Sequence, residues 1–541
     1  MTTGNREAAP DPAALALARE ALARASGRRR VDLILEASDP EALVQSRPAD
    51  ELYFTIREVG LADAAELVPL ASPEQFRIFL DLEAWRGAEV DERRILPWLR
   101  AARAGSQLGP QAEAGWRSKL EALDPEVLHL VLLGTIQLHD LEEEPDPEIR
   151  STRFMRTPEG RYVVEFSVGG AEYVAVRGLL DDLYAEDPFM ATRLLSALRW
   201  ELRSDLAESA SRWRAGRLAD LGFPDRGEAL SWFARSPARP GAPAGLPDRP
   251  PGFFLAAFRA GTLLDRAAGR LEPAARDRLE GQLAAAANAV MVADEVDPGD
   301  PEMVRQAVAS ARAFIEMGLE ALSGGEEARA AVALAEQPLK RVFQAGFARV
   351  LQLSWRAQRL LQAGGAGSRE APLLDPPLGE AISALVRRRP LYFPGLDLPR
   401  QEWGSPAAAA HEPRPFRSAA EVERTARALD LAEGLAALAR RLGLDLPRTE
   451  PAAPARLGTL YLTALANERL GRPFAAAPIP AAELAGAARA LEAVGDPRLA
   501  EAGEAGALLE QVARAQAEEL VRLLAGPGPR PDLVTALLVR P

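Results

Sequence analysis

The chain has 541 residues, of which 48% are hydrophobic, so it is long enough to form several domains with apolar cores. Its 78 acidic and 65 basic residues give a net charge of -13, which excludes a global positive field that would attract a nucleic-acid backbone. The lack of cysteine excludes disulfides, thiolate metal sites and thiol nucleophiles.

The basic residues are unevenly chosen, because Lys119 and Lys340 are the only lysines among the 65 and leave 63 arginines. Together with abundant alanine, glycine and proline, this indicates codon bias rather than selection for guanidinium chemistry. Arginine runs such as residues 28–30 and 387–389 are therefore weak signals of recognition. The three histidines show no metal-ligand spacing, and no apolar run approaches the roughly 20 residues of a membrane helix. We expect a soluble, cytoplasmic protein with no membrane insertion, metal or cofactor.

An alanine-rich N-terminal extension, residues 1–29, opens the chain, and a helix is predicted over residues 11–26. Residues 30–140 then carry a series of short helix signals. The clearest of these signals begin at Asp39, Ala49, Leu61 and Ser72. Asp or Ser followed by Pro and Glu supplies an N-cap, a first-turn proline and an acid at the positive end of the helix dipole. Helices of about a dozen residues are marginal alone, so we predict a superhelical stack, an architecture used mostly for binding.

Residues 141–235 are predicted to hold a β-hairpin and a long helix. Apolar and polar side chains alternate over residues 162–168 and 171–176, on either side of a Gly-Gly pair, which is typical of a hairpin. The long helix is predicted over residues 187–221. The acidic run before the hairpin, residues 139–148, has two interpretations: a solvated linker or a divalent-cation site.

The second half of the chain is predicted to be helical throughout. A helical bundle is expected over residues 253–362, after a proline-rich linker at residues 236–252, and a C-terminal helical region over residues 378–541. Further loops are expected at residues 364–377 and 399–415. Helices of the C-terminal region are predicted near residues 420–442, 456–470, 481–494 and 504–524. The fold class predicted is therefore mainly α: an N-terminal superhelix of short helices, one β-hairpin, then helical bundles.

Motifs for catalysis and cofactor binding do not stand out. No phosphate-binding loop ending in Gly-Lys-Ser/Thr and no Gly-x-Ser-x-Gly elbow is present, so no catalytic, cofactor or metal residue is predicted. Polar side chains on apolar helix faces form one candidate cluster. Its members are Asn288, Asp294, Glu295, Asn467 and Arg469. Because a buried amide needs hydrogen-bond partners, these residues make either structural bonds between helices or a polar pocket.

Two resemblances add to these patterns. Residues 39–82, with their Asp-Pro-Glu and Ser-Pro-Glu starts, resemble the soluble N-domain of MgtE-type magnesium transporters. This resemblance implies a superhelix of short helices and a binding surface. It does not imply transport, because the sequence has no membrane segment and no CBS pair.

The second resemblance extends from about Arg30 almost to the C-terminal residues. It is carried by residues 287–295, 314–325, 338–347, 389–397 and 463–474, the last reading Thr-Ala-Leu-Ala-Asn-Glu-Arg-Leu-Gly-Arg-Pro-Phe. These strings are similar to a bacterial domain-of-unknown-function family, number 6178, whose members are large and helical. The family resemblance implies no activity.

Two functions remain open. The first is a non-enzymatic scaffold or regulator that binds a protein partner through the N-terminal stack. The alternative is an enzyme or small-ligand binder with its polar pocket in the C-terminal helical half, at the cluster of Asn288 and Asn467. The alternative requires residues 284–295 and 460–471 to approach one another.

Overall fold

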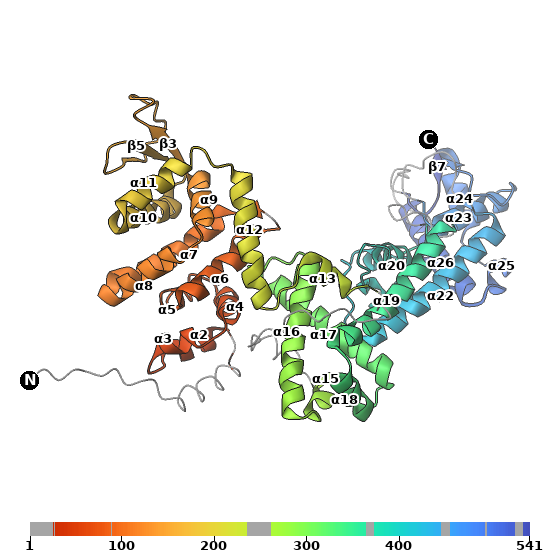
Figure 1. The fold of residues 1–541 in the computed structure, drawn as a ribbon. Coiled ribbons are helices and arrows are strands. Elements are labelled where there is room, and N and C mark those ends of the chain that lie inside the picture. Colours follow the sequence, from red (N-terminus) through yellow and green to blue (C-terminus); the bar gives the residue numbers. More distant parts are fainter. Residues whose placement is uncertain are drawn as a thin grey trace, which may run out of the picture. The chain divides into compact units, whose positions relative to one another are not determined.

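The computed structural model describes residue 25 and residues 27–87, 89–234, 261–363, 373–444, 455–492, 495–524 and 534–540. It is mainly α-helical, as the sequence predicts (Figure 1). The chain divides into two compact units. The first holds the described residues up to Ile315 and Leu322–Phe343, and the second holds Glu316–Ala321 and the described residues from Gln344 onward. Apart from residue 25, the helix predicted over residues 11–26 lies outside the described residues, as do the linker at 236–252 and most of the loop at 364–377.

Residues 27–135 of the first unit form the short-helix region. Its elements are α2 (Gly27–Leu35), α3 (Pro40–Gln45), α4 (Ala49–Val59), α5 (Leu67–Leu70), α6 (Pro73–Glu83), β1 (Trp85–Arg86), β2 (Glu89–Val90), α7 (Glu92–Ala104), η1 (Gly105–Leu108), α8 (Pro110–Glu121) and α9 (Pro125–Thr135). From α2 to α9, each helix contacts the helix two places further along the chain. The short helices therefore bury their apolar faces on one another, as their length requires.

The predicted helix starts are confirmed at Asp39 and Ser72. The Asp39 carboxylate accepts a hydrogen bond from the Ala42 N–H at 2.9 Å, with Pro40 in the first turn. At α6, the Ser72 hydroxyl accepts from the Gln75 N–H at 3.2 Å while the Gln75 side chain accepts from the Ser72 N–H at 2.9 Å. This reciprocal capping box satisfies two donors that the helix itself leaves free.

Replacing the cap at α6 should have a modest effect on stability. We expect Ser72→Ala to lower the free energy of unfolding by about 1 kcal/mol, because one N-terminal donor of α6 loses its acceptor. Urea unfolding followed by circular dichroism measures the change. Ser72→Asp, which restores a capping oxygen, should recover most of it, and an equal loss in both variants would contradict the capping role.

The β-structure differs from the prediction in its second strand. Residues 162–166 do form a strand, β5 (Tyr162–Phe166), but the segment predicted as its partner begins a helix, α10 (Gly170–Glu186). The partners of β5 are β3 (Ile136–Asp140) and β4 (Phe154–Arg156), both antiparallel. All five residues of β5 are buried, as expected for the central strand of a three-stranded sheet.

The single long helix predicted over residues 187–221 is also wrong. Two helices take its place, α11 (Pro188–Ala197) and α12 (Arg203–Asp220). Between them, Arg199 donates a hydrogen bond to the buried Asp140 carboxylate at 2.7 Å, and Leu202 adopts an extended conformation. No glycine or proline marks this break, so a tertiary contact overrides the local helical pattern.

The rest of the first unit is helical. It contains α13 (Arg226–Ser231), α15 (Leu263–Gly269), α16 (Pro273–Ala293), α18 (Glu327–Glu336) and parts of α17 (Pro301–Ser323) and α19 (Leu339–Gln362). A group of aromatic rings, Trp232, Phe233, Phe314 and Phe343, packs between α13, α17 and α19. The predicted helical character of residues 261–362 is confirmed.

The second unit contains the remaining parts of α17 and α19 and the C-terminal elements. These are α20 (Leu378–Leu385), η2 (Pro394–Asp397), η3 (Arg400–Glu402), α21 (Pro406–Ala409), α22 (Ala419–Leu442), α23 (Leu457–Arg469), β6 (Ile479–Pro480), η4 (Ala481–Glu483), α24 (Leu484–Ala490), α25 (Pro497–Ala500), α26 (Gly503–Leu524) and β7 (Val539–Arg540). The predicted C-terminal helices are confirmed at α22, α23, α24 and α26. Leu538 packs with Leu373 and Leu460 in one apolar cluster, so residues 534–540 are part of this core.

Candidate interaction site

A buried carboxylate lies where α4, α6 and α7 of the short-helix region meet. Glu83, the last residue of α6, accepts a hydrogen bond from the Tyr53 hydroxyl at 2.9 Å and from Arg94 Nε at 3.0 Å. Its second oxygen also lies 3.6 Å from Arg57 Nε. A buried carboxylate is tolerated only when it is paired and hydrogen-bonded, and both oxygens of Glu83 meet that condition. Glu83 thereby pairs with two neighbouring arginines, Arg94 through a hydrogen bond and Arg57 through an ion pair, and we name this group the Arg57–Glu83–Arg94 platform.

Local structure explains why these side chains meet. Arg57 lies in the last turn of α4 and Arg94 in the first turn of α7, while the β1–β2 turn brings the chain back from α6 to α7. Behind the platform, the Tyr53 ring stacks on Trp98 with centroids 5.5 Å apart, and Phe79 packs on Trp98 at 5.4 Å. All three rings are fully buried. The platform therefore stands on a packed aromatic core.

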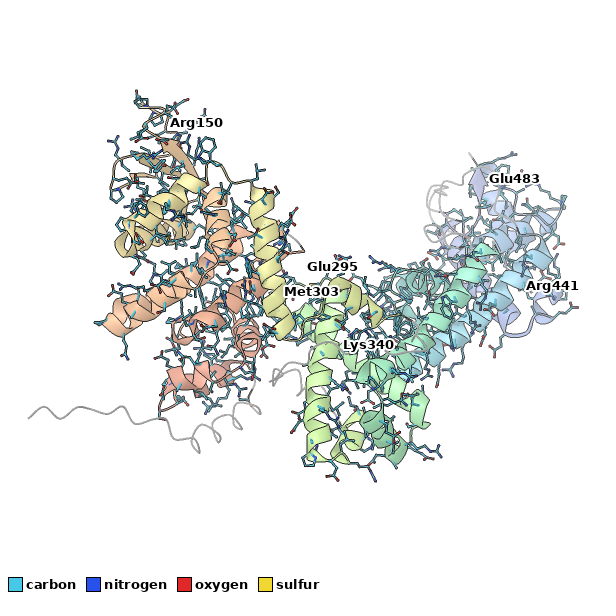
Figure 2. All side chains as sticks on the ribbon, in the orientation of Figure 1. Arg150, Glu295, Met303, Lys340, Arg441 and Glu483 are labelled. Atoms are coloured by element: carbon cyan, nitrogen blue, oxygen red, sulfur yellow. The ribbon has the colours of Figure 1, made fainter. Side chains whose placement is uncertain are left out.

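The outer side of the platform holds the loop between α16 and α17. Arg94 donates from Nη1 and Nη2 to the two oxygens of Asp297, at 2.7 and 2.9 Å. Arg57 donates to the carbonyl oxygen of Gly299 from Nε at 2.9 Å and also from Nη2. Asp297 in turn accepts a hydrogen bond from the Gly299 N–H at 2.9 Å, which closes an Asx turn. Figure 2 labels Glu295 and Met303, which flank this loop.

The guanidinium groups of the platform approach Gly299 closely. A Cβ atom at this position would overlap Nη2 of Arg94, and it would also lie 3.4 Å from Nη2 of Arg57. The two guanidinium groups therefore approach the backbone on the side where a side chain would stand. A Gly299 variant with a side chain must push Arg94 away from Asp297, so the site selects glycine by close approach.

The charges of the site are matched. Burial acts to raise the pKa of Asp297, but the hydrogen bonds from Arg94 and from the Gly299 N–H hold that pKa below its ordinary value. The same hydrogen bond from Arg94 to Asp297 raises the pKa of the Arg94 guanidinium. Without Asp297, the platform carries two arginines against one glutamate. Asp297 supplies the missing negative charge, in the bidentate geometry that strengthens an arginine–carboxylate pair.

Three of the predicted cluster residues lie on α16 or directly after it, on the element that leads into this loop. Asn288, on α16, is fully buried and donates from Nδ2 to the Leu221 carbonyl oxygen at 3.2 Å. Asp294 caps the C-terminus of α16, and Glu295, in the left-handed region with φ of 52°, pairs with Arg226. These contacts tie the end of α16 to the segment that follows α12, and so position the loop.

The other two predicted residues, Asn467 and Arg469, belong to the second unit. Asn467 is buried on α23 and donates to the carbonyl oxygens of Ala475 and Ala477 at 3.0 and 2.9 Å. Arg469 donates to the Ala490 carbonyl oxygen at 2.7 Å. Both side chains hold backbone segments around α23. Because the two halves of the cluster belong to different units, the joint pocket stays a prediction.

The residues of the platform and its loop escaped the sequence reasoning. Arg57 and Arg94 stand 242 and 203 residues from the loop residues that they bind, and the abundance of arginine hides them. One local signal was available: Asp297-Pro-Gly after a helix is typical of a turn that an aspartate side chain closes. That signal predicts the turn but does not indicate which side chains bind it.

The described residues also contain an open groove, but no metal-binding cluster and no helix that could span a membrane. A groove of about 590 Å³ in the second unit is lined by Leu491, Glu492, Arg514, Ala517, Glu518, Val521 and Arg522, none of which belongs to the predicted cluster. In the part of the chain that the structure describes, no group of three or more His, Asp or Glu side chains is arranged to hold a metal ion. No helix in those same ranges is long and apolar enough to cross a membrane.

Comparison with protein families identifies the class of the chain. Residues 8–526 match the model described as "Family of unknown function (DUF6178)". The match covers nearly the whole chain, so the protein belongs to this family, as the strings in its second half predict. No curated protein matches the chain, and no solved structure does.

Proposed function

We propose that the protein is a non-enzymatic scaffold or regulator that binds a protein partner through its short-helix region. The observation that carries this proposal is the Arg57–Glu83–Arg94 platform, which holds a backbone turn from a distant part of the sequence. Its contacts select a peptide: a bidentate pair to a carboxylate, two donors to a carbonyl oxygen and close approach to a glycine. Peptide recognition of this kind needs no catalytic group. The resemblance of residues 39–82 to the MgtE-type N-domain, with its superhelical stack, is in keeping with such a role.

Exposed apolar side chains next to the short-helix region lend further support. Phe189 and Trp200 are 75% and 77% exposed, and Leu202 and Trp213 are also largely in solvent. These residues lie on α11, on the connection to α12, and on α12, which itself packs against α6 and α9. Tryptophan and phenylalanine are enriched at protein interfaces, because they bury a large area at a small cost in conformational entropy.

Site-specific photocrosslinking in the cells that make the protein tests the proposal. A photoreactive amino acid would replace exposed Arg86 or Arg117 of the short-helix region, one at a time, in the full chain. We expect each of these positions to crosslink a second protein in cells. Matched control positions are Arg305 and Arg329, which are similarly exposed on α17 and α18. Equal crosslinking from the test and control positions, or none from the test positions, would contradict the proposal.

The alternative, a small-ligand site in the C-terminal half, keeps one supporting observation. The groove beside α26 has a volume in the range of ligand pockets. A thermal-shift screen of metabolites and nucleotides separates the two functions, because a ligand at 100 times its dissociation constant adds about 2.7 kcal/mol of stability. A ligand found in this way should lose its effect in Arg514→Ala, which changes the groove and leaves the platform intact.

A further inference from the structure

We propose that the Arg57–Glu83–Arg94 platform is a recognition site for an acidic Asp-x-Gly turn of a partner protein, and that Asp297–Gly299 of this chain occupies the site in competition with that partner. The inference rests on the proposed scaffold function and names the chemistry of the partner. The loop between α16 and α17 then acts as an internal ligand, and the partner binds when its own turn replaces the loop.

The platform is built without help from the loop. Within the short-helix region, Glu83 orients Arg94 through a hydrogen bond and attracts Arg57 at 3.6 Å, and the Tyr53 hydroxyl completes the bonding of that carboxylate. The aromatic rings of Tyr53, Phe79 and Trp98 support the platform from behind. Departure of the loop therefore leaves Arg94 hydrogen-bonded to Glu83 and Arg57 paired with Glu83 at 3.6 Å, while the hydrogen bonds of Arg57 to the Gly299 carbonyl oxygen are freed for another acceptor. A site arranged in advance of its ligand loses little conformational entropy on binding.

The loop, by contrast, lies on the outside of the site. The Asp297 side chain is 35% exposed, whereas that of Arg94 is 14% exposed and that of Glu83 is buried. The loop residues contact the platform through hydrogen bonds and one ion pair. Polar contacts at a partly exposed edge exchange readily for equivalent contacts from another molecule.

The donors of the platform define its ligand. Arg94 presents two parallel N–H groups, which match a carboxylate, while Arg57 directs its donors to one carbonyl oxygen two residues further on. The Asx turn sets the distance between these acceptors, since Asp297 Oδ1 accepts from the Gly299 N–H. A longer glutamate side chain does not form this turn, and a Cβ at the third position overlaps Arg94. A free anion offers neither the carbonyl oxygen nor the glycine, so a peptide turn is the fitting occupant.

Competition from the loop sets the apparent affinity. A loop tethered at both ends by helices has an effective concentration in the millimolar range or higher at its own site. The apparent dissociation constant of a partner turn equals its intrinsic value divided by the fraction of molecules in which the loop has left the platform. The wild-type chain should therefore bind an isolated turn weakly, and weakening of the loop should strengthen that binding.

Fluorescence anisotropy on the full chain tests this inference with a defined probe. The probe is a labelled peptide with the sequence of residues 293–301, Ala-Asp-Glu-Val-Asp-Pro-Gly-Asp-Pro. Asp297→Asn weakens the loop, and Gly299→Ala is a second, independent way to do so. We expect either variant to bind the probe at least tenfold more tightly than the wild-type chain does. Adding Arg94→Gln to either variant should reduce the affinity at least tenfold.

The controls separate turn recognition from charge attraction. A second peptide keeps every charge of the probe and carries alanine for the glycine that matches Gly299, and it should bind at least tenfold more weakly. Circular dichroism and melting temperature verify that each variant is folded. Equal binding of both peptides, or no gain in the loop variants that remain folded, would overturn the inference. Failure of the peptide test with successful crosslinking rejects this site alone, whereas probe binding without any crosslinked partner rejects the scaffold function.

Discussion

Replacing Arg217 by methionine should lower the free energy of unfolding by about 3–5 kcal/mol at pH 7, because it leaves two carboxylates without their partner. Arg217, on α12, donates to both oxygens of Asp81 at 2.6 and 2.8 Å and to the Asp124 carboxylate at 2.6 Å. Asp81 is buried on α6, and Asp124 precedes α9. This arginine thus joins three helices through one charged cluster. Urea unfolding followed by tryptophan fluorescence measures the loss.

A matched control lies on the same helix. Arg212 pairs with Glu208 one turn earlier on α12, in solvent, so Arg212→Met should change stability by no more than about 1 kcal/mol. Equal losses of stability from the two variants would show that the loss comes from replacing any arginine on α12, and not from breaking the buried cluster.

The pH dependence of the Arg217 variant gives a second check. Burial raises the pKa of Asp81, and the hydrogen bonds from Arg217 oppose that rise. Without Arg217, the folded-state pKa moves further above the unfolded value, so the folded state binds a proton that the unfolded state does not. The variant should therefore regain stability as the pH falls from 7.5 to 5.5. A loss that stays constant over this range would contradict the assignment to uncompensated carboxylates.

The helices could be predicted because their signals lie within a few residues of one another. The sheet was predicted less well, because its strands pair with segments that are distant in the sequence. The caps at Asp39 and Ser72 act on donors three residues away, so they are visible in a short window. The strand that pairs with residues 162–166 is distant in the sequence, because β3 begins at Ile136. Gly170 has φ of 55° and starts a helix rather than a hairpin. Leu179, Leu180 and Leu183 of α10 are buried at helical spacing, which outweighs the alternation at 171–176.

The candidate site shows the same limit. Asp294 and Glu295, two members of the predicted polar cluster, lie at the end of α16 and directly precede the loop that enters the site. The identity of the arginines that bind the turn depends on how α4 and α7 pack, which no local pattern encodes. Neither the close approach at Gly299 nor the buried position of Glu83 has a signature in composition or spacing. The sequence patterns therefore indicated residues beside the loop, but neither the loop that enters the site nor the surface that receives it.

Asp50→Asn should stabilise the protein increasingly as the pH rises, with a relative gain of about 3 kcal/mol between pH 5 and pH 8. Asp50 lies in the first turn of α4 and is 1% exposed, and among the described residues its Oδ2 atom has no hydrogen-bond partner. Burial is the main cause that raises its pKa from 3.8 to about 7. The neighbouring Glu51, also buried, adds like-charge repulsion.

The sign of the effect follows from proton linkage. Between pH 4 and pH 7 the folded state holds a proton on Asp50 that the unfolded state has released, so wild-type stability falls as the pH rises through this window. Asparagine has no proton to lose, and it keeps an oxygen that can accept from the Glu51 N–H as Asp50 does at 3.0 Å. Asp39→Asn makes the same change in charge at a helix cap where asparagine is an equally good residue, and it controls for net charge. Urea unfolding of the three proteins from pH 5 to pH 8 measures the curves. Parallel curves for the wild type and Asp50→Asn would show that the buried carboxyl does not titrate as its surroundings require.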